Sequence, residues 1–255
     1  MLIDGAGREA AVERLRRAGC VAAERESAEL VAAAPDAATL EAWLARREQG
    51  EPPAWITGRV RFAQRWLAVA PGVYVPRPQT AELARRAGAH LPPSGRALDL
   101  CTGAGAVAAH LSRTAPGAQV MGVDLDPRAA ACARRNGVVA WVADLDESLA
   151  GGVGFDLVTA VAPYVPTGLL GLLPADVQRY EPALALDGGP DGLALVRRVI
   201  VAAGRRLHPG GWLVLEVGGD QDQALSEPLS GAGFNLVRSW RDEEGDLRGI
   251  EARRG

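Results

Sequence analysis

From Arg96 onward, the chain alternates between apolar runs of strand length and longer segments with helical periodicity. Parallel strands joined by helices are buried on both faces, which is why such runs are apolar throughout. Two further runs, 234–240 and 249–252, flank the polar turn 242–246 and predict an antiparallel hairpin. We therefore predict an α/β domain with a mostly parallel seven-stranded sheet, whose first five strands lie at 97–100, 120–124, 138–142, 156–160 and 212–217.

The chain before Arg96 has a different character. Apolar residues recur at helical spacing through the first part, and Gly19, Pro35 and Gly50 interrupt them. A stretch rich in proline and aromatic residues follows and favours a connector with a hairpin. The predicted organisation is an N-terminal helical substrate-recognition domain at 1–54, a hairpin connector at 55–82 and the α/β domain at 83–255.

Composition argues against several kinds of partner. Hydrophobic residues make up 48% of the chain, yet no apolar run can span a bilayer, so we expect no membrane contact. The 28 basic and 31 acidic residues are interspersed, and we expect no direct nucleic-acid contact. The N-terminus lacks the segments of a secretory signal, which favours a cytoplasmic protein. The cysteines and histidines show no metal-ligand spacing, so no metal site is predicted.

The segment after the first predicted strand has the features of a ligand-binding loop. Its glycines let the backbone turn tightly and approach a ligand without a Cβ in the way. An acidic residue at the end of the next strand can accept hydrogen bonds from both ribose hydroxyls, and a third acidic residue after the following strand is placed to contact an adenine. The predicted cofactor-binding residues are Asp99, Cys101, Thr102, Gly103, Gly105, Asp124, Leu125 and Asp144.

Two other interpretations of this loop stay open. The Gly-x-Gly pattern also satisfies the relaxed dinucleotide fingerprint, which would favour NAD. A plain strand–turn–helix corner, with Asp124 and Asp126 capping the next helix, would need no ligand. S-Adenosylmethionine is favoured because Asp99 suits a cationic methionine group better than a pyrophosphate, and because the loop reads Thr-Gly-x-Gly.

Several motifs together resemble those of the HemK/PrmC-type protein-(glutamine-N5) methyltransferases. The resemblance covers nearly the whole chain and implies a Rossmann-like class I methyltransferase domain preceded by a small helical domain. It also implies S-adenosyl-L-methionine as cofactor, S-adenosyl-L-homocysteine as product, and a release factor or ribosomal protein as the partner bearing the acceptor glutamine. The motifs lie at 75–80, 99–105, Asp124, 162–164, 180–182, 185–193 and 216–218.

The sequence departs from this family at the acceptor motif. The family's fourth strand ends in Asn-Pro-Pro-Tyr, which holds the acceptor glutamine, whereas this chain has Val161, Ala162, Pro163 and Tyr164 as its predicted catalytic set. An amide nitrogen is a poor nucleophile, because its lone pair is delocalised into the carbonyl. The Val161 side chain cannot accept a hydrogen bond from it, and losing one preorganised bond of this kind typically costs about 10²–10³ in rate.

Three consequences of this substitution are possible. Another residue replaces the asparagine, the acceptor is a more nucleophilic nitrogen such as that of a small-molecule metabolite, or the chain is a non-catalytic cofactor-binding interaction protein. The intact motif around Pro163 and Tyr164 favours a working N-methyltransferase that acts on a glutamine or other side-chain nitrogen of a protein. Glu216, at the end of the fifth strand, is expected either to act in the site or to pair with an arginine.

Overall fold

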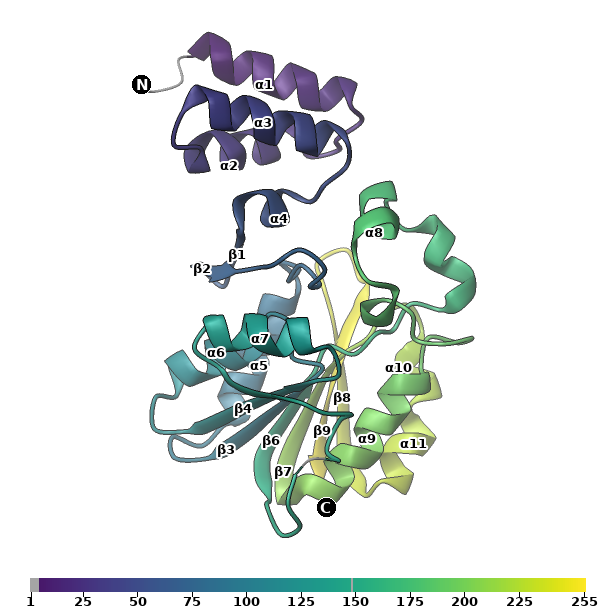
Figure 1. The fold of residues 1–255 in the computed structure, drawn as a ribbon. Helices are drawn as coiled ribbons and strands as arrows, with labels where there is room; N and C mark the ends of the chain where they lie inside the picture. The colour runs from purple at the N-terminus through teal and green to yellow at the C-terminus, as the bar shows by residue number, and fades with distance from the viewer. Residues whose placement is uncertain (1–4, 148) are drawn as a thin grey trace.

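The computed structural model describes residues 5–147 and 149–255. It has a small helical part, a short hairpin and a large α/β part, in that order along the chain (Figure 1). Residues 1–4, which begin the predicted helical domain, and Ser148 lie outside the described residues.

The helical part buries a compact apolar core. Leu15, Leu30 and Leu44 come from three different helices and are almost fully buried together. Asp36 caps the third helix by accepting a hydrogen bond from the Thr39 amide at 2.7 Å. The helices of this part are α1 (Gly5–Arg17), α2 (Ala23–Ala33), α3 (Ala37–Glu48) and the short α4 (Pro53–Thr57).

The predicted hairpin follows α4. Strands β1 (Arg59–Phe62) and β2 (Arg65–Ala68) pair antiparallel, and the two residues between them have positive φ angles, as in a type I′ turn. The Asn136 side chain clamps this hairpin to the α/β part, because it bonds both the amide and the carbonyl of Ala68, at 2.8 and 2.9 Å. Helix α5 (Thr80–His90) begins before residue 83, so the proposed boundary at 82/83 falls inside this helix.

Seven strands of the described residues form one sheet in the order β5-β4-β3-β6-β7-β9-β8. Pairing is parallel from β5 through β7 and antiparallel for β7–β9 and β8–β9, which confirms the predicted sheet and terminal hairpin. The strands are β3 (Arg96–Leu100), β4 (Gln119–Asp124), β5 (Val139–Val142), β6 (Phe155–Ala160), β7 (Leu207–Glu216), β8 (Phe234–Arg241) and β9 (Leu247–Arg254).

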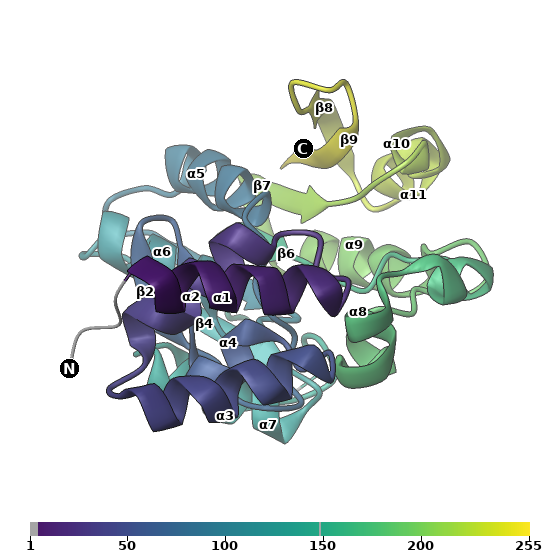
Figure 2. The same ribbon diagram turned by 90° about the horizontal axis from the view of Figure 1, so that it is seen from above.

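Helices cover both faces of this sheet (Figure 1). On one face lie α5, α6 (Ala106–Thr114) and α7 (Pro127–Arg135), which share an apolar cluster with the strands. The other face packs on α9 (Ala194–Arg206) and α11 (Ser226–Gly231). The short α10 (Gln221–Ala224) lies against β9. The remaining segments, η1 (Thr167–Leu172), α8 (Ala175–Tyr180) and η2 (Ala183–Ala185), follow β6, and α8 lies beside the helical part (Figure 2).

The strand order determines where a ligand can bind. From β3 the chain moves outward to β4 and β5 and then returns to β6 on the other side of β3. The loops after β3 and β6 therefore diverge at one edge and leave a crevice there. Leu100 and Ala160 are partners in the parallel register, so the glycine loop and the 161–164 segment begin side by side.

Candidate functional site

A cleft of about 990 Å³ opens at the carboxyl ends of the central strands and extends to the helical part. Its volume is that of a site for a small organic ligand. All of the sequence-predicted site residues except Gly105 line it, from the glycine loop on one side to the 161–164 segment on the other. The structure therefore brings the predicted cofactor residues and the predicted acceptor residues into one cavity.

The two glycines of the loop serve different purposes. Both have positive φ angles, 57° at Gly103 and 79° at Gly105. A Cβ on Gly105 would lie 3.0 Å from the side chains of Ala133 and Val138, whereas a Cβ on Gly103 would meet no atom within 4 Å. Gly105 is thus needed for close packing of the loop on α7, and Gly103 leaves open space at the cleft.

Asp99 lies beneath the loop and is buried. Its two carboxylate oxygens accept hydrogen bonds from the hydroxyls of Thr102 and Thr159, each at 2.6 Å. Burial raises the pKa of Asp99 to about 6, although both hydrogen bonds favour the charged form. Burial also raises the pKa of the neighbouring Cys101 thiol, which is therefore protonated at neutral pH.

Asp124 holds the loop from the adjacent strand. Its Oδ2 accepts from the Gly103 amide at 2.8 Å, and its Oδ1 accepts from the Asp126 amide at 2.9 Å. Each oxygen keeps a further lone pair for a ligand. The helix cap is Asp126, which accepts from the Arg128 amide at 2.8 Å, so the capping interpretation is confirmed for Asp126 and wrong for Asp124. Leu125, between them, is half exposed beside the cleft.

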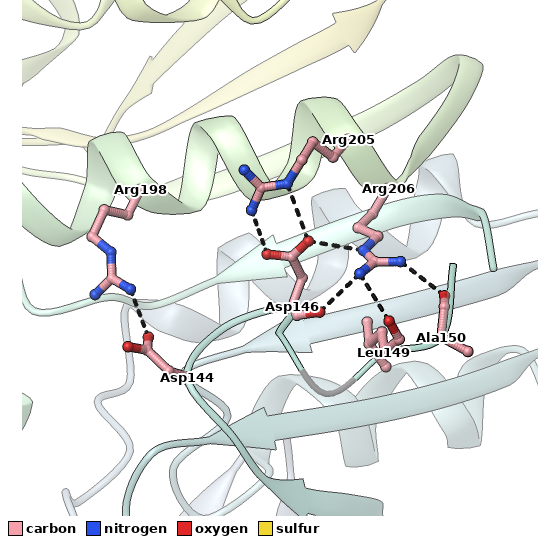
Figure 3. A network of polar contacts seen from close by, with 7 residues as sticks. All are labelled: Asp144, Asp146, Leu149, Ala150, Arg198, Arg205 and Arg206. Carbon is pink, nitrogen blue, oxygen red and sulfur yellow. Dashed lines mark hydrogen bonds and ion pairs between the residues drawn. The ribbon is translucent and has the colours of Figure 1, made fainter. Parts of the chain in front are cut away.

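Arginines of α9 hold the segment that carries Asp144 (Figure 3). Arg198 donates to one Asp144 oxygen at 2.9 Å, and both residues line the cleft. Two residues further on, the buried Asp146 accepts from Arg205 at 2.6 Å and from Arg206 at 2.8 Å. These ion pairs fix the backbone beside the predicted adenine position.

The 161–164 segment forms the opposite wall. Ala162 and Pro163 are buried, and Val161 packs against the apolar cluster that includes α5 and α6. The Tyr164 hydroxyl donates to Glu216 Oε1 at 3.2 Å, and the Tyr164 carbonyl accepts from Gln221 at 2.9 Å. Burial and the Glu216 charge raise the pKa of Tyr164, so its phenol remains protonated.

Glu216 joins this wall to the segment before α5. Its Oε2 accepts from the Thr80 hydroxyl at 2.6 Å, while Oε1 accepts from Tyr164, and the carboxylate is only 3% exposed. The expectation that Glu216 pairs with an arginine is wrong, since within the described residues its hydrogen-bond partners are these two hydroxyls. The sequence indicates Glu216 as a candidate residue but does not identify Thr80 as its partner. The one sequence feature that points to Thr80 is its position at the end of the 75–80 motif.

Two motifs that are distant in the sequence meet at the cleft. Arg77 donates to Glu181 at 2.5 Å, and the Val75 amide contacts the other Glu181 oxygen at 3.5 Å. The Arg77 guanidinium also lies 4.9 Å from the Tyr74 ring centroid. Burial raises the pKa of Tyr74 to about 12, so its phenol stays neutral.

The helical part lies above the α/β part in Figure 1, and residues of α2 and α3 line the cleft. Arg47 of α3, which is 5% exposed, donates to Glu26 at 2.7 Å and to Asp176 of α8 at 3.2 Å. The Tyr180 hydroxyl donates to the Gln49 carbonyl at 3.0 Å. An ion pair buried in this way specifies geometry more than it adds stability, and here it fixes α8 against the helical part.

Two kinds of feature are absent from the described residues. Residues 5–147 and 149–255 contain no cluster of three or more histidine, cysteine, aspartate or glutamate side chains arranged to hold a metal ion. Within the same ranges, every helix is too short or too polar to cross a membrane.

The strand order and the helices on both faces define a Rossmann-like fold of the class I methyltransferase type. A solved methyltransferase from Pyrococcus furiosus superposes with a TM-score of 0.54 at 18% identity, over 74% of this chain and 88% of that one, and supports the fold. No protein-family model matches the chain.

Sequence comparison identifies the family. The release factor glutamine methyltransferase of Geobacter sulfurreducens is 37% identical over 218 residues, which cover 83% of this chain and 76% of that protein. The chain therefore belongs to the release factor glutamine methyltransferase family and is an S-adenosylmethionine-dependent methyltransferase. The 4-amino-L-phenylalanine/4-methylamino-L-phenylalanine methyltransferase of Streptomyces pristinaespiralis is 38% identical over 193 residues, which cover 70% of this chain and 65% of that protein.

The loop geometry leads to a paired prediction. Gly105→Ala should lower the free energy of unfolding by about 3 kcal/mol, because it adds both a left-handed strain and an overpacked Cβ. Gly103→Ala is the matched control and should cost only about 1 kcal/mol, because its Cβ meets open space. Urea denaturation of both variants measures the difference, and equal losses would mean that Gly105 does not pack as described.

Proposed function

We propose that this protein transfers a methyl group from S-adenosylmethionine to a side-chain nitrogen of a protein, with the glutamine of a release factor as the leading acceptor. The observation that carries the proposal is the juxtaposition of the glycine loop and the 161–164 segment, which leave paired strands and face one cleft. A family relationship over more than four fifths of the chain supports the acceptor class. The proposed setting is the cytoplasm.

The residues present suit the cofactor. The free lone pairs of Asp124 are available to the ribose hydroxyls, Leu125 offers an exposed apolar surface for the base, and Asp144 offers an acceptor for its amine. Asp99 supplies negative charge near the cationic amino group. Bound S-adenosylmethionine supplies an electrophilic methyl group and leaves as S-adenosylhomocysteine.

The protein's own contribution is positioning. Methyl transfer from a sulfonium needs the nitrogen lone pair in line with the methyl carbon, and fixing that geometry supplies much of the rate. Ala162, Pro163 and Tyr164 form the wall against which the acceptor side chain would lie, and Ala162 and Pro163 are themselves buried. Val161 offers no side-chain hydrogen-bond acceptor to the nitrogen.

A second candidate function has a specific observation in its favour. By its name, the Streptomyces pristinaespiralis relative methylates 4-amino-L-phenylalanine and 4-methylamino-L-phenylalanine. Its identity to this chain, 38%, lies within the range of 32% to 39% found for the release factor enzymes. An arylamine lone pair is less delocalised than that of an amide, so it depends less on a side chain at the position of Val161. We therefore keep an arylamine metabolite as the alternative acceptor.

Radiolabelled methyl transfer tests the proposal. The protein is incubated with labelled S-adenosylmethionine and either a glutamine-bearing release-factor fragment, the same fragment with that glutamine changed to alanine, or 4-amino-L-phenylalanine. Label in the first fragment alone supports the leading acceptor, and label in the amino acid alone supports the alternative. Absence of label from all three, with cofactor binding intact, would overturn both.

The Asp124 contacts predict a large effect on cofactor affinity. Asp124→Ala should weaken S-adenosylhomocysteine binding more than about tenfold, because two ribose hydroxyls lose their acceptor. Asp126→Ala is the control, since Asp126 lines the same cleft but its carboxylate is engaged by the amide and guanidinium of Arg128. It should change affinity less than about twofold while lowering stability by about 1 kcal/mol. Titration calorimetry measures both, and unchanged binding in the Asp124 variant would show that the cofactor site lies elsewhere.

Burial of Asp99 predicts a pH dependence of cofactor binding. Its pKa, raised to about 6, means that the carboxylate is charged above that pH and neutral below it. Since the charged form attracts a cationic ligand, affinity should be full above about pH 7 and fall about tenfold by pH 5. Calorimetry with S-adenosylhomocysteine across this range should show the fall in the unaltered protein and a flat profile in Asp99→Asn. A flat profile in the unaltered protein would contradict the assignment.

A further inference from the structure

The Glu216 carboxylate lies behind the acceptor side of the cleft. It belongs to the end of β7, is almost completely buried, and does not line the cavity, whereas Thr80 and Tyr164 both do. Its two oxygens are each occupied by one hydroxyl, Thr80 at 2.6 Å and Tyr164 at 3.2 Å. One carboxylate therefore joins two cleft-lining side chains, one at the start of α5 and the other in the segment after β6.

The direction of these hydrogen bonds has a chemical consequence. A carboxylate can only accept hydrogen bonds, so both hydroxyls must donate to Glu216. A hydroxyl has a single proton, and once that proton is committed, the oxygen presents only lone pairs to its other neighbours. Thr80 and Tyr164 are thereby set as hydrogen-bond acceptors while Glu216 is ionised. Burial raises the pKa of Glu216, whereas the hydrogen bonds from Thr80 and Tyr164 favour its charged form.

A nitrogen acceptor needs such groups. Accepting the hydrogens of an amide or amine orients its lone pair and favours the positive charge that develops on nitrogen during methylation. The family motif supplies a side-chain oxygen at the position of Val161, and this chain does not. Thr80 and Tyr164 both line this cleft, and their hydroxyls are hydrogen-bonded to the two oxygens of one carboxylate.

We propose that the Thr80 and Tyr164 hydroxyl oxygens accept hydrogen bonds from the methylated nitrogen and that Glu216 is the positioning residue that holds both in this role. This inference rests on the proposed function and deepens it, because it identifies the groups that take over from the missing asparagine. No proton is transferred to either hydroxyl in this step.

The test compares variants that differ by one atom or one charge. Thr80→Val removes the oxygen and keeps the shape, Thr80→Ser restores the oxygen, Tyr164→Phe removes the phenol, and Glu216→Gln inserts an amide donor that turns one hydroxyl round. Thr167→Val is the matched control, because the Thr167 hydroxyl also donates to a carboxylate, that of Asp187 at 2.7 Å, but lies outside the cleft lining.

The readouts are kcat and KM for labelled methyl transfer to whichever of the two named acceptors the unaltered protein methylates, and calorimetric affinity for S-adenosylhomocysteine. We expect kcat to fall about 10²-fold in Thr80→Val, Tyr164→Phe and Glu216→Gln, with cofactor affinity within about twofold of the unaltered protein. Thr80→Ser should recover most of the loss, and Thr167→Val should lose nothing.

The outcomes separate this inference from the proposed function. Full kcat in both Thr80→Val and Tyr164→Phe overturns the inference while the proposed function stands. A Thr80→Ser variant as slow as Thr80→Val overturns it as well. The hydroxyl would then be present without restoring the rate, so the loss in Thr80→Val would come from altered packing. If the unaltered protein methylates neither acceptor, the proposed function itself fails, and the inference fails with it. If Glu216→Gln does not fold, the rates of Thr80→Val, Thr80→Ser and Tyr164→Phe test the inference on their own.

Discussion

The cleft depends on one buried carboxylate. Asp99 sits on the central strand β3 and bonds a hydroxyl of its own loop and a hydroxyl of the neighbouring strand β6. A buried charge is costly unless it is hydrogen-bonded, so these contacts constrain both partners. Because β6 runs directly into the 161–164 segment, the interaction that holds the glycine loop also holds the origin of the opposite wall.

Periodicity was sufficient to predict the α/β part, because buried parallel strands must be apolar and the helices between them must cover both faces. Periodicity does not predict at which residue a strand or helix begins or ends. Strand β5 starts at Val139 rather than at 138, since strand ends depend on partners. Helix α5 begins at Thr80, because the Pro-Arg-Pro segment ends there and nothing at residue 83 starts a new element.

The site shows the same division between local and non-local information. The glycine loop and Asp124 were predictable, because a nucleotide-like ligand at the end of a strand needs a tight turn and a nearby acidic residue. The sequence could not show that Gly105 serves packing rather than the ligand, because the space around it is filled by α7. Nor could it pair Thr80 with Glu216, which are 136 residues apart and meet only through the sheet order.

The two proposed acceptors place different demands on this cleft. An amide nitrogen has two hydrogens and a delocalised lone pair, so it needs acceptors on both sides to be held in line for transfer. An arylamine needs less help and can tolerate an apolar residue at position 161. The chain has a buried carboxylate, Glu216, bonded by two hydroxyls beside the acceptor wall, and burying a carboxylate costs free energy unless it is hydrogen-bonded. Since an amide nitrogen benefits most from two hydrogen-bond acceptors, the proposed role of the Glu216 network agrees with the proposed amide acceptor even though the asparagine is absent.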